Sequence, residues 1–221
     1  MGPAPGRAHN HRMKRITAVC LLFLTPLGSA TEKSLHMAPD AAHRGAVKML
    51  MSEPENSYRY DALILKHAQA HHLDPRMVKS IISAESRFYD GAVSPKGARG
   101  LMQVMPMTAE ELGVPRSRLH DPDSNLRAGT AYLDLLCRRA RIIYALDDVG
   151  CRDAPLWVQE RVVAAYHAGP RMLHHDPDRW PPMTRLYVRE VFLDYRSPAT
   201  ALTRPLIRTA PKPLRDLLAR R

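Results

Sequence analysis

Apolar residues recur at helical spacing through the middle of the chain. In the stretch DPRMVKSIISAESRF, residues 74–88, Asp74 can cap a helix, and Pro75 suits its first position because proline lacks an N–H that would be unpaired there. The apolar residues that follow lie at helical intervals and mark one buried face: Met77, Val78, Ile81, Ile82 and Phe88. The pattern therefore predicts a helix that begins at Pro75.

Other segments show the same period. Thr108, followed by acidic residues, begins a short helix in TAEEL, and Thr184 caps a last helix in TRLYVREVFLDY. Longer amphipathic helices are predicted in RYDALILKHAQAHH (59–72), NLRAGTAYLDLLCRRARIIYAL (125–146) and PLWVQERVVAAYHAG (155–169). No segment alternates between apolar and polar residues as a strand does. The sequence therefore predicts an all-α, mainly helical domain over residues 59–196.

The two ends of the chain differ from this domain. Residues 1–30 combine a basic head, the apolar run ITAVCLLFLTPLG and the small residues GSA, which is typical of a secretory signal peptide cleaved near Ala30. An uncleaved amphipathic anchor is the alternative. Residues 31–58 have the composition of a linker, and residues 197–221 form a basic, proline-containing tail. The expected location is the periplasm.

The net charge of the chain indicates which classes of molecule it can bind. The formal net charge is +11, and removal of residues 1–30, with four basic and no acidic residues, leaves +7. This charge suits an anionic envelope polymer or membrane surface, whereas no nucleic-acid-binding signature is present.

Cys137 and Cys151 are expected to pair in an oxidising compartment, with two buried free thiols as the alternative. No Cys/His spacing suggests a metal site, and neither metal nor organic cofactor is expected.

One acidic residue falls on an apolar helix face. Glu85 lies three residues after Ile82 and in the last predicted helical turn, where burial and the helix dipole would both raise the pKa of its carboxyl group. A carboxyl group that stays protonated near neutral pH can act as a general acid on a glycosidic oxygen. The alternative is a structural carboxylate paired with Arg87 or Arg99.

The glycine-rich stretch SPKGARGLMQVMP, residues 94–106, follows this helix. Its glycines would let the backbone approach a ligand closely, and Ser94 and Gln103 supply hydrogen-bonding groups. Methionines such as Met105 offer flexible apolar contacts, although they also serve as core residues.

Four sequence blocks, which occur in the same order as in the family, resemble the soluble-lytic-transglycosylase-type family of peptidoglycan enzymes. They are ESRF…AVSPKGARGLMQVMPMTAEELGV, DPDSNLRAGTAYLDLL, AAYHAGP and RLYVREV, within residues 60–195. The resemblance implies a lysozyme-like, mainly helical fold with a groove for a glycan strand. It also implies cleavage of the β-1,4 bond between N-acetylmuramic acid and N-acetylglucosamine with a 1,6-anhydro product.

The resemblance also implies residue roles. Glu85 matches the single acid and base that protonates the leaving oxygen and then takes a proton from the sugar's own 6-hydroxyl group. Ser94 matches a serine near the substrate's N-acetyl group. The other residues implied to bind substrate are Gln103, Met105, Tyr166, His167 and Tyr187. Helix packing is the alternative role for both tyrosines, and His167 stands where the family usually has asparagine.

The sequence thus predicts an exported peptidoglycan lytic transglycosylase that acts on glycan strands. A small catalytic domain with a basic tail resembles members that open the wall for secretion or conjugation machines. One rival hypothesis is a hydrolytic muramidase that uses Glu85 together with Asp90, the other acid close in sequence. The second rival is a non-catalytic scaffold that binds peptidoglycan.

Overall fold

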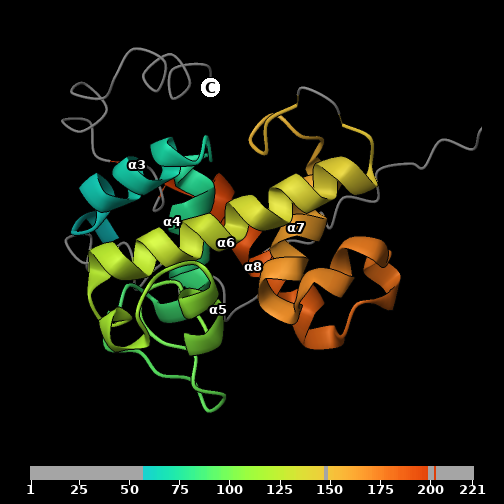
Figure 1. The fold of residues 1–221 in the computed structure, drawn as a ribbon. Coiled ribbons are helices and arrows are strands. Elements are labelled where there is room, and N and C mark those ends of the chain that lie inside the picture. The colour runs from blue at the N-terminus through green and yellow to red at the C-terminus, as the bar shows by residue number, and fades with distance from the viewer. Residues whose placement is uncertain (1–56, 147–148, 199–201, 203–221) are drawn as a thin grey trace, which may run out of the picture. The chain divides into compact units, whose positions relative to one another are not determined.

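The computed structural model describes residues 57–146, 149–198 and 202, and Figure 1 shows their arrangement. In chain order the elements are α3 (Asp61–Ala70), α4 (Pro75–Ser86), α5 (Pro106–Glu111), η1 (Arg116–Arg118), α6 (Pro122–Ile143), α7 (Leu156–Ala168), η2 (Pro170–His174), η3 (Pro177–Arg179) and α8 (Pro182–Arg196). In the described part, β-structure is limited to isolated bridges that pair Val93 with Arg99 and Arg99 with Val104. The prediction of an all-α domain is confirmed.

The long helix α6 runs across the middle of the domain, with α3 and α4 toward one end and α7 toward the other (Figure 1). Helix α8 packs against both α4 and α7. The apolar faces predicted from the sequence meet in this interior. Ile81 and Ile82 of α4, Leu136 of α6 and Val188 of α8 are completely buried. Burial of these faces supplies the main free energy that holds the helices together.

The start of α4 follows the predicted capping chemistry, whereas the starts of α5 and α8 differ from the prediction. Asp74 accepts a hydrogen bond from the backbone N–H of Arg76 at 2.9 Å, and Pro75 opens α4 as expected. The start predicted at Thr108 is wrong by two residues, because α5 begins at Pro106, and the cap predicted at Thr184 is wrong by three, because Pro181 precedes the first residue of α8, Pro182. Proline at the first helical position loses no hydrogen bond and already has a helical φ angle.

A buried ion pair joins α3 to α4. The ammonium group of Lys79 lies 2.7 Å from a carboxylate oxygen of Asp61, and both side chains are completely buried. Burial lowers the pKa of Lys79, and the carboxylate of Asp61 opposes that shift. Removal of either partner would leave a buried charge without its counter-ion, which typically costs several kcal/mol. The pair therefore holds α3 against the helix that carries Glu85.

A second polar connection joins the start of α4 to the end of α8. The phenol of Tyr195 donates to the Asp74 carboxylate at 2.7 Å, while the Arg76 guanidinium donates to the Tyr195 carbonyl at 2.7 Å. These contacts fix α8 on α4, and the same helix pair carries Glu85 and Tyr187.

The predicted signal peptide, nearly all of the linker at 31–58 and nearly all of the tail at 197–221 lie outside the described residues. Within the described part, none of the helices has both the length and the apolar character needed to cross a membrane.

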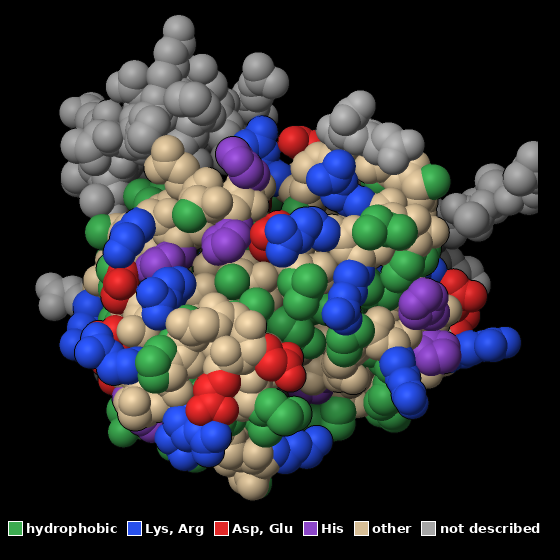
Figure 2. Space-filling view, in the orientation of Figure 1, with side chains coloured by type: hydrophobic (Ala, Val, Ile, Leu, Met, Phe, Trp, Pro, Cys, Tyr) green, Lys and Arg blue, Asp and Glu red, His purple; other side chains and the backbone are tan. Residues whose placement is uncertain are grey.

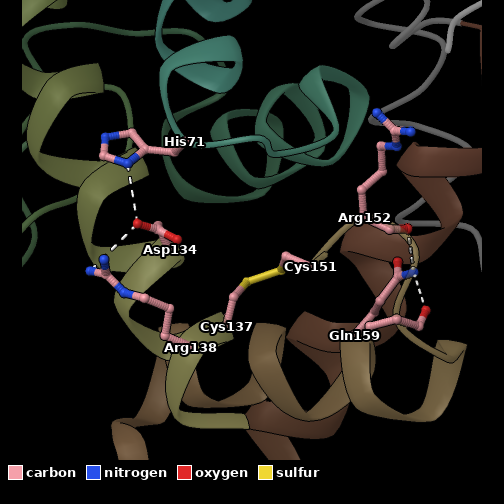
Figure 3. Close-up of a disulfide and its surroundings, with 8 residues drawn as sticks. His71, Asp134, Cys137, Arg138, Cys151, Arg152 and Gln159 are labelled. Carbon is pink, nitrogen blue, oxygen red and sulfur yellow. Dashed lines mark hydrogen bonds and ion pairs between the residues drawn. A yellow bond between two sulfur atoms is a disulfide. The ribbon is translucent and has the colours of Figure 1, made fainter. Parts of the chain in front are cut away.

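A disulfide joins Cys137 of α6 to Cys151 in the connection between α6 and α7 (Figure 3). The two Cα atoms are 5.4 Å apart, a separation that suits a disulfide. Beside it, Asp134 accepts from His71, the residue after α3, at 3.3 Å and lies 3.5 Å from Arg138. The bridge and these polar contacts together hold the end of α3 and the α6–α7 connection on the same stretch of α6.

We expect this disulfide to form when the full-length chain folds under oxidising conditions. Thiol labelling of the denatured, unreduced full-length chain should modify only Cys20 of the 3 cysteines. Labelling after reduction should modify all 3. Replacing Cys137 and Cys151 together by alanine should lower the free energy of unfolding by about 3 kcal/mol, the scale for closing a loop of this length. Three reactive thiols before reduction would exclude the bridge.

Candidate active site

Glu85 lies in the last turn of α4 and faces Tyr187 of α8. The phenol of Tyr187 donates a hydrogen bond to Oε1 of Glu85 at 2.7 Å. Tyr187 is 7% exposed and Glu85 is partly buried, so the contact lies at the edge of the core. Residues 102 positions apart in sequence therefore meet because α4 and α8 pack together.

The surroundings of Glu85 keep its carboxyl group protonated to unusually high pH. Burial raises the pKa of Glu85 from 4.5 to about 7, the hydrogen bond from Tyr187 lowers it in part, and the negative charge of Glu190 adds to the rise. Burial dominates because a desolvated carboxylate loses its hydration energy. The helix end acts in the same direction, since the C-terminal end of the dipole disfavours negative charge.

The alternative of a structural ion pair at Glu85 is wrong. Within the described residues, no arginine or lysine side chain lies within salt-bridge distance of Glu85, and neither Arg87 nor Arg99 contacts its carboxylate. A carboxyl group that faces a phenol and a second carboxylate instead holds its proton near neutral pH.

The backbone just after Glu85 adopts an uncommon conformation. Arg87 and Phe88 have φ angles of 50° and 63°, in the left-handed region that costs a non-glycine residue roughly 1–2 kcal/mol. The turn ends α4 and returns the chain to the core, where Phe88 is 5% exposed. It thereby leaves Glu85 in the final helical turn, next to the loop that follows.

The loop from Ala92 to Met105, which follows the turn after Glu85, is held by α6. The side chain of Asn125 accepts from the N–H of Met102 and donates to the carbonyls of Arg99 and Leu119, each at 2.8 Å. Gly100 has a φ of 75°, and a Cβ atom there would lie 2.2 Å from the Asn125 amide. Glycine at position 100 is therefore required for the close approach of the loop to α6.

Two predicted residues shape this loop from within. Gln103 donates from its side-chain amide to the carbonyls of Ala92 at 3.2 Å and Gly100 at 2.9 Å. The Ser94 hydroxyl accepts from the N–H of Ala98 at 3.0 Å, so its own hydrogen remains available for donation. Met105 is 42% exposed at the start of α5 and can offer apolar surface to a ligand.

Tyr166 of α7 joins the loop to the interior. Its phenol donates to the carbonyl of Met102 at 2.9 Å, and its ring packs on that of Tyr132 at 5.5 Å between centroids. The pKa of Tyr166 is raised well above its usual value by burial and then by the nearby charge of Glu85. Tyr166 is thus near Glu85, but its hydroxyl is used to position Met102.

His167 lies on the outer side of Tyr187. The two rings are stacked with centroids 4.3 Å apart and planes 20° apart. Burial, followed by the positive charge of Lys96, lowers the pKa of His167. The imidazole is therefore neutral at pH 7 and covers the phenol that donates to Glu85.

Asp90 is held by a different part of the structure. Its carboxylate accepts from the phenol of Tyr60 at 2.9 Å and lies 3.9 Å from the guanidinium of Arg59. Burial and this contact raise the pKa of Tyr60 to about 12. Asp90 therefore fixes the start of α3 against the turn that follows α4.

The sequence interpretation missed three residues that build the site. Glu190 acts electrostatically on Glu85, Tyr132 packs on Tyr166, and Asn125 holds the loop. Glu190 lies three positions after Tyr187, so it shares a helix face with that residue, and this spacing was a usable signal. Among the described residues, no cluster of His, Cys, Asp and Glu side chains could hold a metal ion.

Comparisons with known proteins agree on one family. The model of the transglycosylase SLT domain matches residues 62–179. Membrane-bound lytic murein transglycosylase C of Haemophilus ducreyi is 31% identical over 167 residues, which are 70% of this chain and 43% of the relative. Membrane-bound lytic murein transglycosylase F of Desulfosudis oleivorans is 38% identical over 96 residues, or 40% of this chain and 21% of the relative. The chain thus spans less than half the length of these curated relatives.

Solved structures include two similar chains. An inactive mutant of the lytic transglycosylase Slt from Pseudomonas aeruginosa has a TM-score of 0.48 and 28% identity, covering 69% of this chain and 25% of that one. The 70 kDa soluble lytic transglycosylase of Escherichia coli has a TM-score of 0.49 and 24% identity. The match covers 66% of this chain and 26% of that one.

We expect protonation of His167 to affect turnover of purified sacculi. Because the pKa of His167 is lowered, its positive charge appears only below the usual imidazole range of about 6.5. A cation stacked on Tyr187 strengthens that phenol as a donor to the Glu85 carboxylate and lowers the pKa of Glu85. The rate profile should therefore show an additional inflection on its acidic side.

The variant His167→Asn should keep activity and lose this inflection. His72→Asn is the matched control, because His72 is exposed and its φ of 52° suits asparagine. A wild-type profile in the His167→Asn variant would show that His167 does not act on the site.

Proposed function

Because the chain belongs to the transglycosylase SLT domain family, we propose that it is a peptidoglycan lytic transglycosylase. It cleaves the β-1,4 bond between N-acetylmuramic acid and N-acetylglucosamine and leaves a 1,6-anhydro end. The observation that carries the proposal is the carboxyl group of Glu85, whose pKa is raised to about 7 and which accepts a hydrogen bond from Tyr187. A group with this pKa can give up and take back a proton at neutral pH.

In the first step, protonated Glu85 donates its proton to the glycosidic oxygen, and the bond from that oxygen to C1 of the muramic acid breaks. The sugar acquires oxocarbenium character, and the released N-acetylglucosamine end carries the proton. Glu85 is now a carboxylate beside the negative charge of Glu190, and the hydrogen bond from Tyr187 stabilises it.

In the second step, the 6-hydroxyl oxygen of the same muramic acid attacks C1. Its proton passes to the Glu85 carboxylate, which restores the starting state of the enzyme. No water is consumed, so the reaction needs no second carboxylate to activate one. The raised pKa of Glu85 favours both steps, because the group must be an acid first and a base afterwards.

The environment of Asp90 supports this single-carboxylate scheme over the rival muramidase. A muramidase would need Asp90 as nucleophile or as the base for a water molecule. The carboxylate of Asp90 is instead engaged by Tyr60 and lies near Arg59. The acidic side chain that acts on Glu85 is Glu190, and its effect is to keep Glu85 protonated.

We propose that the residues around Glu85 bind the glycan in different ways. The Ser94 hydroxyl donates to a polar group of the sugar, and exposed Met105 packs against its apolar face. His167, stacked on Tyr187, occupies the outer edge of the site. Gln103 and Tyr166 act mainly by holding the loop, since both donate to its backbone carbonyls.

The place of action proposed is the periplasm. The basic head and apolar run of residues 1–30 support export, and the net charge of +7 that is left after removal of these residues favours contact with an anionic wall polymer. Service to a secretion or conjugation machine is a further proposal that rests on the resemblance to specialised members alone.

The variant Glu85→Gln tests the proposed chemistry. Glutamine has almost the same shape but can neither protonate the leaving oxygen nor take the proton of the 6-hydroxyl group. Release of muropeptides from purified sacculi should fall by about two to four orders of magnitude, the usual contribution of general acid–base groups. Circular dichroism should show an intact fold, because a neutral amide is easier to bury than a carboxylate.

Asp90→Asn is the matched control and should retain most of the activity, since the amide can still accept from Tyr60. Mass spectrometry should find wild-type products one water lighter than hydrolysed muropeptides. Substantial activity in Glu85→Gln would refute the assigned role. Reducing-end products together with an inactive Asp90→Asn would establish the muramidase instead.

A further inference from the structure

A hollow of about 350 Å³ lies at the C-terminal end of α6, away from the residues assigned to the reaction. Its lining comes from the last turns of α6 and from η2: Arg139, Ile142, Ile143, Pro170, Arg171, Leu173 and His174. This set contains none of the residues assigned to the candidate active site. The reaction proposed above therefore gives the hollow no role.

The apolar part of this hollow combines two exposed side chains with a buried one. Ile142 is 82% exposed and its neighbour Ile143 is 36% exposed, whereas Leu173 beneath them is 1% exposed. Figure 2 shows hydrophobic side chains beside basic ones over the end of α6 and the segment after α7. An exposed isoleucine pair at the rim of a concave apolar surface suits an inserted side chain of another molecule.

The basic residues of the hollow have no acidic partner in the described part of the chain. No carboxylate within residues 57–146 and 149–198 pairs with Arg139 or Arg171. The neighbouring Arg138 differs, because it lies 3.5 Å from Asp134. The helix dipole favours a cation such as Arg139 in the last turns of α6. It gives no reason for Arg171 and His174, which come from η2.

We propose that this hollow binds an acidic segment of a protein partner, with an apolar side chain inserted between Ile142 and Leu173 and flanking carboxylates on Arg139 and Arg171. Guanidinium groups bind carboxylates through paired, charge-assisted hydrogen bonds, which gives such a contact direction as well as attraction. His174 adds an imidazole at the rim of the hollow, and its ring nitrogens can donate or accept a hydrogen bond.

Two other occupants fit less well. A membrane surface would contact the exposed Ile142 but leave the recessed Leu173 without a partner, whereas a single inserted side chain contacts both. The chain's own tail, residues 203–221, carries six basic residues and one acid, so Arg139 and Arg171 would repel it. Charge complementarity therefore selects an acidic peptide.

NMR chemical-shift mapping on the isotope-labelled full-length chain tests the proposal with three capped peptides. The probe is Asp-Glu-Leu-Phe-Glu-Asp. A neutral peptide, Asn-Gln-Leu-Phe-Gln-Asn, lacks its charge, and Asp-Glu-Ser-Ser-Glu-Asp lacks its apolar centre. The probe should bind at least about tenfold more tightly than either comparison peptide, because only it satisfies both parts of the hollow. The shifts should centre on Ile142, Arg171 and His174.

Substitutions in the hollow test which of its residues contribute to the affinity for the probe peptide. Arg139→Glu combined with Arg171→Glu, and separately Ile142→Asp, should each weaken the probe at least about tenfold, as expected for a lost charge-assisted contact or a lost apolar one. Arg138→Glu is the matched control one position away and should leave binding unchanged. Turnover of sacculi should stay at the wild-type level in all of these variants.

Three outcomes would overturn the proposal. Equal binding of all three peptides would show that the hollow does not select this chemistry, and shifts confined to residues 203–221 would assign the attraction to the basic tail. Binding to vesicles of phosphatidylglycerol and phosphatidylcholine that is lost in Ile142→Asp, with no peptide response, would assign the surface to a membrane.

Discussion

Burial of the Glu85 carboxyl group between α4 and α8 is the constraint on which the site depends. Desolvation raises the pKa of this group to about 7, and Glu190 adds to the rise while Tyr187 limits it. An apolar residue at position 85 would pack with less cost, because a carboxylate there loses its hydration. The helix keeps a strained exit at Arg87 and Phe88, with φ angles of 50° and 63°, and so holds the carboxyl group at the edge of the core. Stability given up at such a position is typical of functional sites.

The rest of the domain keeps this carboxyl group in place. The buried pair of Lys79 and Asp61 fixes α3 on α4, and Tyr195 with Asp74 fixes α8 on α4. Asn125 ties the loop after α4 to α6 through two hydrogen bonds, and its third goes to the carbonyl of Leu119 after η1. Two of these connections join a site-bearing element to α3 or α6, and the contact between Tyr195 and Asp74 joins the two helices that carry Tyr187 and Glu85. Rigid support of this kind is what a general acid needs to remain at a fixed distance from its substrate.

The spacing of apolar and polar residues along the sequence predicted much of this arrangement. The apolar period located α4 and the other main helices, and it also singled out Glu85, because a carboxylate interrupts the apolar face there. Helix starts were misplaced where proline rather than threonine opened the helix, as at Pro182. Contacts between distant segments left little local signal beyond the spacing of Tyr187 and Glu190 on one helix face. The stacking of His167 on Tyr187 and the effect of Glu190 on Glu85 depend on how α7, α8 and α4 pack. Residue roles beyond Glu85 came mainly from resemblance to a family, and the structure shows that Gln103 and Tyr166 donate to backbone carbonyls of the loop.

The central claim is that the Glu85 carboxyl group keeps its proton up to about neutral pH. NMR titration of the Glu85 side-chain carboxyl carbon measures the pKa of this group directly. Comparison with the Glu85→Gln spectrum assigns the resonance. The account predicts a midpoint near 7 in the wild-type protein. It predicts a higher midpoint in Tyr187→Phe, because loss of the phenol removes the hydrogen bond that favours the carboxylate. Tyr195→Phe, which alters only the contact with Asp74, should leave the midpoint unchanged. A wild-type midpoint near the ordinary value of 4.5 would contradict the account.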